Sequence, residues 1–472
     1  MKAANEEFNV LDSIEKHIET KPQSTEQTAD LEGEIKEAKE EFNVLDSIEK
    51  HIELSKPPSP PAIEKQIETL EPTLPQPAAA YVIGAKEAKG PFDVLNSVKK
   101  HIETLKPLLP KQATVYIGEY SIKLLLKQPF VDETGRTLQV LLGKSSEEVY
   151  KWIPKGFNPH LVLGLEDANI ETHFWYNVYP FISQDQTLVE GLKKKPTEKL
   201  RNAIVVAAVW DGIGSASIPA LISKFKESNI HSLSIAILPS KIQATDAYFN
   251  ALAALGMYAN NDDAVVLLLD RDLLENYEGV DRDGSLIKGN VVANYLVNLF
   301  LAKENLVEEL SEQSRAFNAK MYAPLLVTGA SIKIYGSIEN MLNTTLLKPL
   351  LNFDLSTVSL LYCLVRIPAS LKEKLPRAQI ELSIANWFKE KTTLKSLYIT
   401  EPVYVEDSSD RVDLVLFASG FHITEMAVDY EKKAKSLGSR ALKKGFMDKK
   451  DWQEMMKNLG VKKDEEASAE AS

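Results

Sequence analysis

Residues 205–225, VVAAVWDGIGSASIPALISKF, carry an apolar run into a turn of small residues and then into an amphipathic stretch. This pattern predicts a buried strand, a tight turn and a helix. Free backbone N–H groups and the helix dipole make such a helix N-terminus a site for phosphate. Gly212, Gly214 and Ser215 are the candidate phosphate-binding residues. Asp211 places a carboxylate beside them, which would repel a phosphate by on the order of a kcal/mol.

Alternating strand-like and helical stretches surround this turn. The strand-like runs are TVYIGEY, HLVLGLE, AIVVAAVW, SLSIAILP and AVVLLLD. Near-continuous apolar strands separated by helices predict a parallel sheet covered on both faces. A long helical stretch follows at 285–310, and VSLLYCLVRI, LKSLYIT and VDLVLFASGF then predict a second, smaller α/β unit.

The composition excludes several classes of protein. A chain of 472 residues with a net charge of −12 has no general basic surface for nucleic acid. Its single cysteine, Cys363, excludes a disulfide framework and any cysteine-based zinc cluster. The longest apolar runs are about half of what a membrane span needs, and the acidic N-terminus does not resemble a signal peptide. We therefore expect a soluble cytoplasmic protein without a transmembrane segment.

The N-terminal region contains a repeated segment. EEFNVLDSIEKHIETKP at 6–22 recurs as EEFNVLDSIEKHIELSKP at 40–57 and as GPFDVLNSVKKHIETLKP at 90–107, with proline-rich stretches between the copies. Apolar residues fall at helical spacing in each copy, so each predicts a short amphipathic helix on a disordered tail. Such a helix is marginal alone in water. The copies are either docking peptides for an unknown protein partner, which multivalency would favour, or a solvated tail produced by duplication.

The last region, about 428–472, is helical and basic. Between Tyr430 and Lys463, ten Lys and one Arg face two Asp and two Glu. The apolar side of the segment FMDKKDWQEMMKNLG carries Phe446, Trp452 and Met455. Three interpretations stay open: a solvated helical hairpin, binding to the acidic N-terminal repeats, and peripheral contact with an anionic membrane surface.

The turn at 210–216 resembles the GGGTGSG signature loop of the tubulin/FtsZ superfamily, and other segments resemble further family motifs in the same order. These segments are SIAILPSKIQATDAYFNALAAL, NDDAVVLLLDRDLL, SLIKGNVVANYLVNLF, NFDLSTVSLLYCLV and RVDLVLFASGF. The resemblance covers about 112–425 and suggests a divergent, archaeal type of FtsZ-like protein. It implies an α/β fold: a tubulin/FtsZ-like parallel-sheet nucleotide-binding domain, a central helix and a smaller second α/β domain, with disordered or helical tails.

The implied domain organisation has five parts. They are a tail with short amphipathic helices at 1–111, a GTPase-like α/β domain at 112–284, a central helix and loop at 285–310, a second α/β domain at 311–427 and a basic helical tail at 428–472.

The resemblance also implies a guanine-nucleotide site. Asp246 lies on the helix at the ribose side, Asn294 matches the asparagine that reads guanine, and Asn290 stands where an aromatic ring usually stacks. If the resemblance holds, the turn at 211–217 and the amide of Asn294 share one cleft.

Acidic residues lie near all three candidate phosphate loops. Gly118 of the first loop is followed by Glu119, and the third, GLEDANIETHFW, has no clear match to the family pattern. We therefore expect binding of GTP or GDP to be weakened or lost, with Mg²⁺ present only if a nucleotide binds.

Hydrolysis in this family needs acidic residues from a neighbouring subunit, in a loop after the central helix. One register places that loop near RAFNAKMYA, where Lys320 and Ala323 stand at the acidic positions. Another places it at NLVEEL, with Glu308 or Glu309 as the acid. Glu308 is the candidate catalytic residue, and the departures predict at most a slow GTPase, that is, a pseudo-GTPase.

Three functions remain open from the sequence. The first is an FtsZ-like cytoskeletal or cell-division protein with a degenerate GTP site, which self-associates into filaments or dimers, or regulates them, and recruits a partner through its repeats. The second is an active GTP-hydrolysing, polymerising GTPase. The third is a monomeric binding scaffold that retains the fold.

Overall fold

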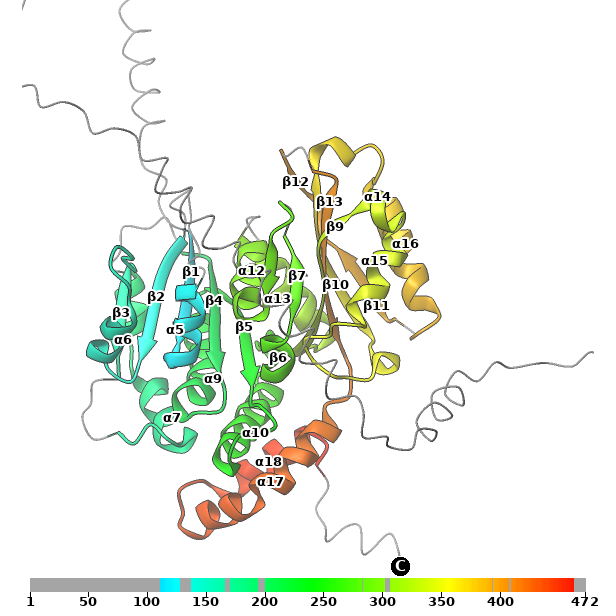
Figure 1. The fold of residues 1–472 in the computed structure, drawn as a ribbon. Coiled ribbons are helices and arrows are strands. Elements are labelled where there is room, and N and C mark those ends of the chain that lie inside the picture. The colour runs from blue at the N-terminus through cyan, green and yellow to red at the C-terminus, as the bar shows by residue number, and fades with distance from the viewer. Residues whose placement is uncertain are drawn as a thin grey trace, which may run out of the picture. The chain divides into compact units, whose positions relative to one another are not determined.

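An 11-stranded sheet runs through the described part of the chain (Figure 1). The computed structural model describes residues 111–127, 137–165, 170–193, 200–281, 283–301, 306–392, 394–406 and 409–461. All of them lie in one compact unit, Gly90–Ser472. The repeats, with the predicted tail at 1–111, lie outside the described residues except for Lys111, so the predictions for them stay predictions.

One side of the sheet is entirely parallel, in the order β3-β2-β1-β4-β5-β6. Its strands are β1 (Gln112–Ile117), β2 (Thr137–Gly143), β3 (Leu161–Gly164), β4 (Asn202–Ala208), β5 (His231–Leu238) and β6 (Val266–Asp270). The strands β1, β2 and β4 are buried along their whole length. Their unbroken apolar runs suit strands that have helices on both faces, and this confirms the predicted fold class.

Helices cover both faces of this parallel part. The sequence before the central helix forms α5 (Gly118–Lys127), α6 (Ser146–Trp152), α7 (Trp175–Gln184), α8 (Thr187–Lys193), α9 (Gly212–Glu227), α10 (Thr245–Asn260) and α11 (Arg271–Glu275). Phe225 of α9 and Phe249 of α10 belong to the core on one face. Leu125 of α5 belongs to the core on the other, together with Phe300 of the central helix.

The predicted helical stretch at 285–310 is divided in the structure. A small hairpin, β7 (Glu278–Val280) and β8 (Leu286–Lys288), precedes the central helix α12 (Gly289–Leu301), and α13 (Leu306–Phe317) follows it. Residues 302–305, between the two helices, lie outside the described residues.

The rest of the sheet is mixed. Its strands are β9 (Met321–Ser331), β10 (Leu360–Pro368), β11 (Ser396–Ile399), β12 (Val403–Val405) and β13 (Arg411–Ser419). Strand β13 pairs antiparallel with both β9 and β10. Strand β9 meets β6 only through Val266↔Met321 and Leu267↔Tyr322, so the smaller α/β unit continues the same sheet. It also contains α14 (Ile332–Tyr335), α15 (Ile338–Thr345), α16 (Arg377–Lys389) and the short 3₁₀ helices η2 (Leu355–Thr357) and η3 (Ala369–Leu371).

The C-terminal helices α17 (Thr424–Lys443) and α18 (Lys449–Asn458) pack on α10 (Figure 1). Tyr430 contacts Tyr248 edge to face, with ring centroids 5.2 Å apart, and Met455 and Met456 are buried. Two aromatic rings of this segment contact the body of the protein. Trp452 lies 5.6 Å from Phe249, and Phe446 stacks on Tyr176. None of the helices in the described part is both long and apolar enough to cross a bilayer.

Candidate functional site

A cleft lies where the strand order reverses. The chain runs outward from β1 through β2 to β3 and returns to β4 on the other side of β1. Such a switch point leaves a crevice outside the carboxyl ends of the strands. A cleft of about 600 Å³ lies there, lined among others by Tyr120, which follows β1, and by Trp210 and Asp211, which follow β4. The sequence-predicted turn therefore borders the crevice where ligands bind in open parallel sheets.

The N-terminus of α9 is capped by the side chain of Asp211. The backbone N–H of Gly214 donates to Asp211 Oδ1 at 2.7 Å. The Ser215 hydroxyl donates to the carbonyl oxygen of Asp211 at 2.6 Å, within the first turn of the helix. A helix N-terminus leaves its first N–H groups unpaired, and an aspartate at the N-cap satisfies one of them. The chain's own carboxylate thus holds a donor that an anionic ligand would use.

The two glycines of the turn are required by packing. A Cβ at Gly214 would lie 1.7 Å from the carbonyl oxygen of Ala208 at the end of β4. A Cβ at Gly212 would lie 2.5 Å from the carbonyl oxygen of Thr172. Both positions bring two backbone segments together, which only glycine permits. The glycines therefore have a structural explanation that needs no ligand.

Replacing Gly214 with alanine is expected to lower the free energy of unfolding by about 2–3 kcal/mol, because the new methyl group overlaps backbone that cannot move freely. Gly438 of α17 is the matched control. A Cβ there meets its nearest atom at 3.7 Å, an ordinary contact. Gly438→Ala is therefore expected to stabilise the protein by about 0.5–1 kcal/mol. Urea unfolding measures both variants, and equal effects would contradict the packing explanation.

The Asp211 carboxyl faces the first loop as well. Gly118 has a positive φ of 78°. A Cβ on it would lie 3.6 Å from Asp211 Oδ2. Burial raises the pKa of Asp211 to about 6, although the N–H groups of Gly214 and Ile213 act in the opposite direction. Glu119 raises this pKa further. The carboxyl is therefore charged at neutral pH and gains a proton in mildly acidic solution.

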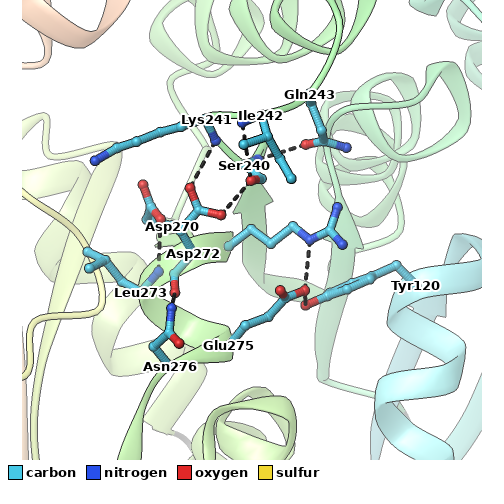
Figure 2. Close-up of polar contacts among 11 residues, drawn as sticks. Tyr120, Ser240, Lys241, Ile242, Gln243, Asp270, Asp272, Leu273, Glu275 and Asn276 are labelled. Atoms are coloured by element: carbon cyan, nitrogen blue, oxygen red, sulfur yellow. Dashed lines mark hydrogen bonds and ion pairs between the residues drawn. The ribbon is translucent and has the colours of Figure 1, made fainter.

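Aromatic rings and an arginine gather in the cleft. The Tyr120 and Trp210 rings meet edge to face at 4.8 Å. The guanidinium of Arg271 lies 5.2 Å from the Tyr120 centroid and 4.9 Å from that of Trp210. Arg271 Nε donates to Glu275 Oε1 at 2.8 Å, and the Tyr120 hydroxyl donates to the same oxygen at 3.3 Å (Figure 2). Cation–π contacts and this ion pair hold the guanidinium against the rings.

The amide of Asn294 is fully engaged inside the protein. Asn294 is 3% exposed on α12. Its Oδ1 accepts a hydrogen bond from the Tyr116 hydroxyl, and its Nδ2 donates to the carbonyl oxygen of Leu124 at 3.1 Å. Leu124 lines the cleft, whereas Asn294 is not among the lining residues. The amide thus lies behind the wall of the cleft. Asn290 is in the first turn of α12, and its side chain lies outside the described residues.

Asp246 is paired near the turn rather than within the cleft. Its Oδ2 lies 2.7 Å from Nε2 of His173, and the pair is partly exposed. Sequence reasoning missed the neighbouring Asn250, which is fully buried on α10. Its Nδ2 donates to the carbonyl oxygens of His173 and Trp210, at 2.9 and 3.2 Å, and its Oδ1 accepts from the Trp175 N–H. One amide therefore ties α10 to both the turn and the start of α7.

The loop after β5 is held by Asp272 of α11. The Ser240 hydroxyl and the backbone N–H of Lys241 both donate to its carboxylate (Figure 2). The hydrogen bond from Ser240 lowers the pKa of Asp272. Asp270 caps the same helix by accepting from the Leu273 N–H at 3.0 Å. The sequence LLLDRDLL carries a helix-start signal in these aspartates, but it does not indicate which loop Asp272 contacts.

Three solved structures of archaeal CetZ proteins superpose on the chain. CetZ from Methanosaeta thermophila strain DSM 6194 has a TM-score of 0.54 and 16% identity, and the match covers 77% of this chain and all of that one. The GDP-bound CetZ1 monomer of Haloferax volcanii gives 0.54 and 15%, with 70% and 99% covered. The GTPγS-bound CetZ2 protofilament of the same organism gives 0.52 and 17%, with 70% and 99% covered. The chain has the tubulin/FtsZ fold.

At these identities the likeness establishes the fold. It confirms the resemblance drawn from the motif order. The sequence matches no protein-family model, and it matches no curated protein either.

Two glutamates lie shortly after the central helix. α12 ends at Leu301 and α13 begins at Leu306, and Glu308 and Glu309 lie in the first turn of α13. The segment RAFNAKMYA lies one helix later, at the end of α13 and the start of β9. Glu308 Oε1 is 3.7 Å from Nε2 of His231, the first residue of β5. Glu308 therefore lies at the amino end of the strands, whereas Asp211 follows their carboxyl end.

Among the described residues, no group of three or more His, Cys, Asp or Glu side chains could hold a metal ion.

Proposed function

We propose that this chain is a cytoskeletal protein of the tubulin/FtsZ type with a degenerate GTP site. It forms filaments, or regulates them, without depending on nucleotide turnover, and it recruits a partner through its repeated N-terminal segments. The observation that supports the proposal is the capping of α9 by Asp211, because a helix N-terminus is where a phosphate would bind and this one already holds a carboxylate.

The cleft fits a guanine nucleotide poorly. A carboxylate about 4 Å from a phosphate makes the free energy of phosphate binding less favourable by about 1–4 kcal/mol, depending on how well water screens the two charges. The Gly214 donor is already bonded, and the Asn294 amide is engaged by Tyr116 and Leu124. The Arg271 guanidinium packs on the Tyr120 and Trp210 rings in the lining of the cleft. A bound nucleotide would have to displace several satisfied interactions and would meet a negative charge.

Self-association is the part of the proposal that draws on the similar structures. CetZ2 was solved as a GTPγS-bound protofilament and CetZ1 as a GDP-bound monomer. A protein with the same fold but a degenerate nucleotide site could still stack head to tail, because stacking needs complementary surfaces rather than hydrolysis. Fold alone does not fix function, so this step needs a direct test.

Calorimetric titration of the full-length protein with GTP and GDP tests the proposal. The expected result at neutral pH is dissociation constants in the millimolar range or weaker. Sedimentation with and without GTP is the second measurement, and we expect equal pelleting in both. Micromolar nucleotide binding would overturn the proposal. A protein that stays in the supernatant under both conditions would instead support a monomeric scaffold.

An active GTPase is the second candidate, and the position of Glu308 favours it. Glu308 follows the central helix and lies at the amino end of the strands, away from the cleft. In a head-to-tail filament it would face the cleft of the next subunit. Steady-state phosphate release from the full-length protein, compared with Glu308→Gln, separates the candidates. Release that the substitution abolishes would favour hydrolysis, whereas the degenerate site predicts none above background.

A further inference from the structure

The helix α17 has one buried side and one exposed side. Its buried residues recur at three- and four-residue spacing and pack on α10: Ala427, Tyr430, Ala434, Gly438 and Ala441. Residues that share a helical face recur at this spacing. The opposite side, which includes Lys432 and Lys443, is exposed.

The exposed side of α17, together with the turn after it and the start of α18, is strongly basic. From Lys432 to Lys450 the sequence holds seven Lys and one Arg against Asp448, a balance of +7. All eight basic side chains are exposed. We define the basic surface as six of them: Lys432, Lys435, Arg440, Lys443, Lys449 and Lys450. An apolar contact lies beside it, because Phe446 is 50% exposed and stacks on Tyr176 with ring centroids 5.3 Å apart.

The N-terminal repeats carry the complementary features. Copies 6–22 and 40–57 each hold five acidic residues against two lysines, a balance of −3. In the predicted helix, Asp12, Glu15 and Glu19 fall on one face beside the apolar stripe. We propose that the basic surface binds the acidic copies of the repeat, residues 6–22 and 40–57. This rests on the proposed role of the repeats as docking helices and names their partner surface.

The third copy provides a contrast within the same chain. Residues 90–107 keep the apolar spacing with Phe92, Leu95 and Val98. They hold two acidic residues against three lysines, a balance of +1. If charge complementarity selects the docking segment, this copy binds the basic surface much more weakly than the other two.

Because the acidic copies outnumber the basic surface, the repeats can link one chain to another. Each chain has two full-length acidic copies and one basic surface, so at least one copy per chain remains for a neighbour. From Pro57 to Gln112 the chain spans 55 residue steps. Extended, this linker reaches about 180 Å. The repeats would therefore tether neighbouring subunits or filaments, and multivalency would strengthen each weak contact.

The test uses the full-length protein with its own acidic copies neutralised, so that the basic surface is open. The six substitutions keep the apolar stripe: Asp12→Asn, Glu15→Gln, Glu19→Gln, Asp46→Asn, Glu49→Gln and Glu53→Gln. Fluorescence anisotropy then measures the binding of a labelled peptide 6–22. We expect saturable binding that weakens at least fivefold between about 50 and 300 mM salt. We expect peptide 90–107 to bind at least tenfold more weakly.

Charge reversal locates the site. The variant carrying Arg440→Glu, Lys443→Glu and Lys450→Glu is expected to weaken peptide 6–22 at least tenfold. A matched variant carrying Lys333→Glu, Lys374→Glu and Lys389→Glu changes three exposed lysines elsewhere and is expected to leave binding within twofold. Circular dichroism checks that both remain folded. Absent or salt-independent binding, equal binding of peptide 90–107, or equal effects of the two variants would overturn the inference.

A membrane is the alternative ligand for a basic surface. Vesicles with about 30% phosphatidylserine are incubated with the same protein, with and without excess peptide 6–22. The inference expects no vesicle binding, or binding that the peptide displaces. Vesicle binding that charge reversal abolishes but the peptide leaves intact would overturn it. Nucleotide titration does not involve these segments, so the inference can fail while the proposed degenerate site stands, and the reverse.

Discussion

Asp413→Asn is expected to lower the free energy of unfolding by about 3–5 kcal/mol, because it leaves the Arg366 guanidinium partly buried without its counter-charge. Asp413 lies on β13 with its side chain 1% exposed, and Arg366 lies on β10 with 18% exposed. Arg366 Nε donates to Asp413 Oδ2 at 2.7 Å. The other oxygen of Asp413 accepts from the Gly329 N–H, also at 2.7 Å.

The same arginine connects the mixed part of the sheet to the central helix. Arg366 Nη2 donates to the Tyr295 hydroxyl of α12 at 3.0 Å, and the guanidinium lies 5.6 Å from that ring. An irregularity in the pairing of β13 with β9, between Val412 and Leu414, accompanies the inward position of Asp413. Loss of the carboxylate charge therefore affects β9, β10 and α12 together.

Urea unfolding followed by tryptophan fluorescence measures this loss. Glu147→Gln removes an exposed pair with Lys151 and is expected to leave the midpoint unchanged. The double variant Arg366→Met/Asp413→Leu is expected to lose less than Asp413→Asn alone, because it removes both charges from the interior. A loss below about 1 kcal/mol for Asp413→Asn would show that water screens the pair.

Asp211→Asn is expected to strengthen GTP binding by about ten- to a hundredfold at pH 7.5. Asparagine caps a helix about as well as aspartate, so the turn keeps its geometry. The negative charge opposite the phosphates is removed, which is worth about 1–4 kcal/mol. Calorimetric titration of the full-length variant gives the comparison. Asp263→Asn, in the loop before β6 at the amino end of the strands, is the control and is expected to leave GTP affinity unchanged.

The pH dependence of GTP binding is a second test of the role of Asp211. Burial raises its pKa to about 6, above the usual range of an aspartate carboxyl. The carboxyl is charged above this pH and neutral below it, so the repulsion of phosphate is present at pH 7.5 and lost as the pH falls through about 6. GTP affinity of the unsubstituted protein is therefore expected to rise between pH 7.5 and 5.5. Asp211→Asn controls for titration of the nucleotide itself. Parallel pH profiles for the two proteins would contradict the assignment.

Local patterns in the sequence were enough for the parallel sheet and for the order of the motifs. Alternation of apolar runs with helices depends on neighbouring residues, and each strand is long enough to show its period. The glycine turn was also visible, because Gly212 and Gly214 follow a strand and start a helix. The register of the acids after the central helix was not visible. It depends on where α12 ends, and the apolar spacing of that stretch continues into the next helix.

By itself, the sequence determined the fold class, the strand–turn–helix element at 205–225 and the presence of a carboxylate beside its glycines. Only the tertiary structure decided what these groups contact. Arg271 stacks on Tyr120 and Trp210, Asn250 ties α10 to the turn, and Asn294 is bonded behind the wall of the cleft. The physical reason is that the periods of strands and helices are local, whereas the contacts around the cleft are made by side chains that the chain brings together from distant positions.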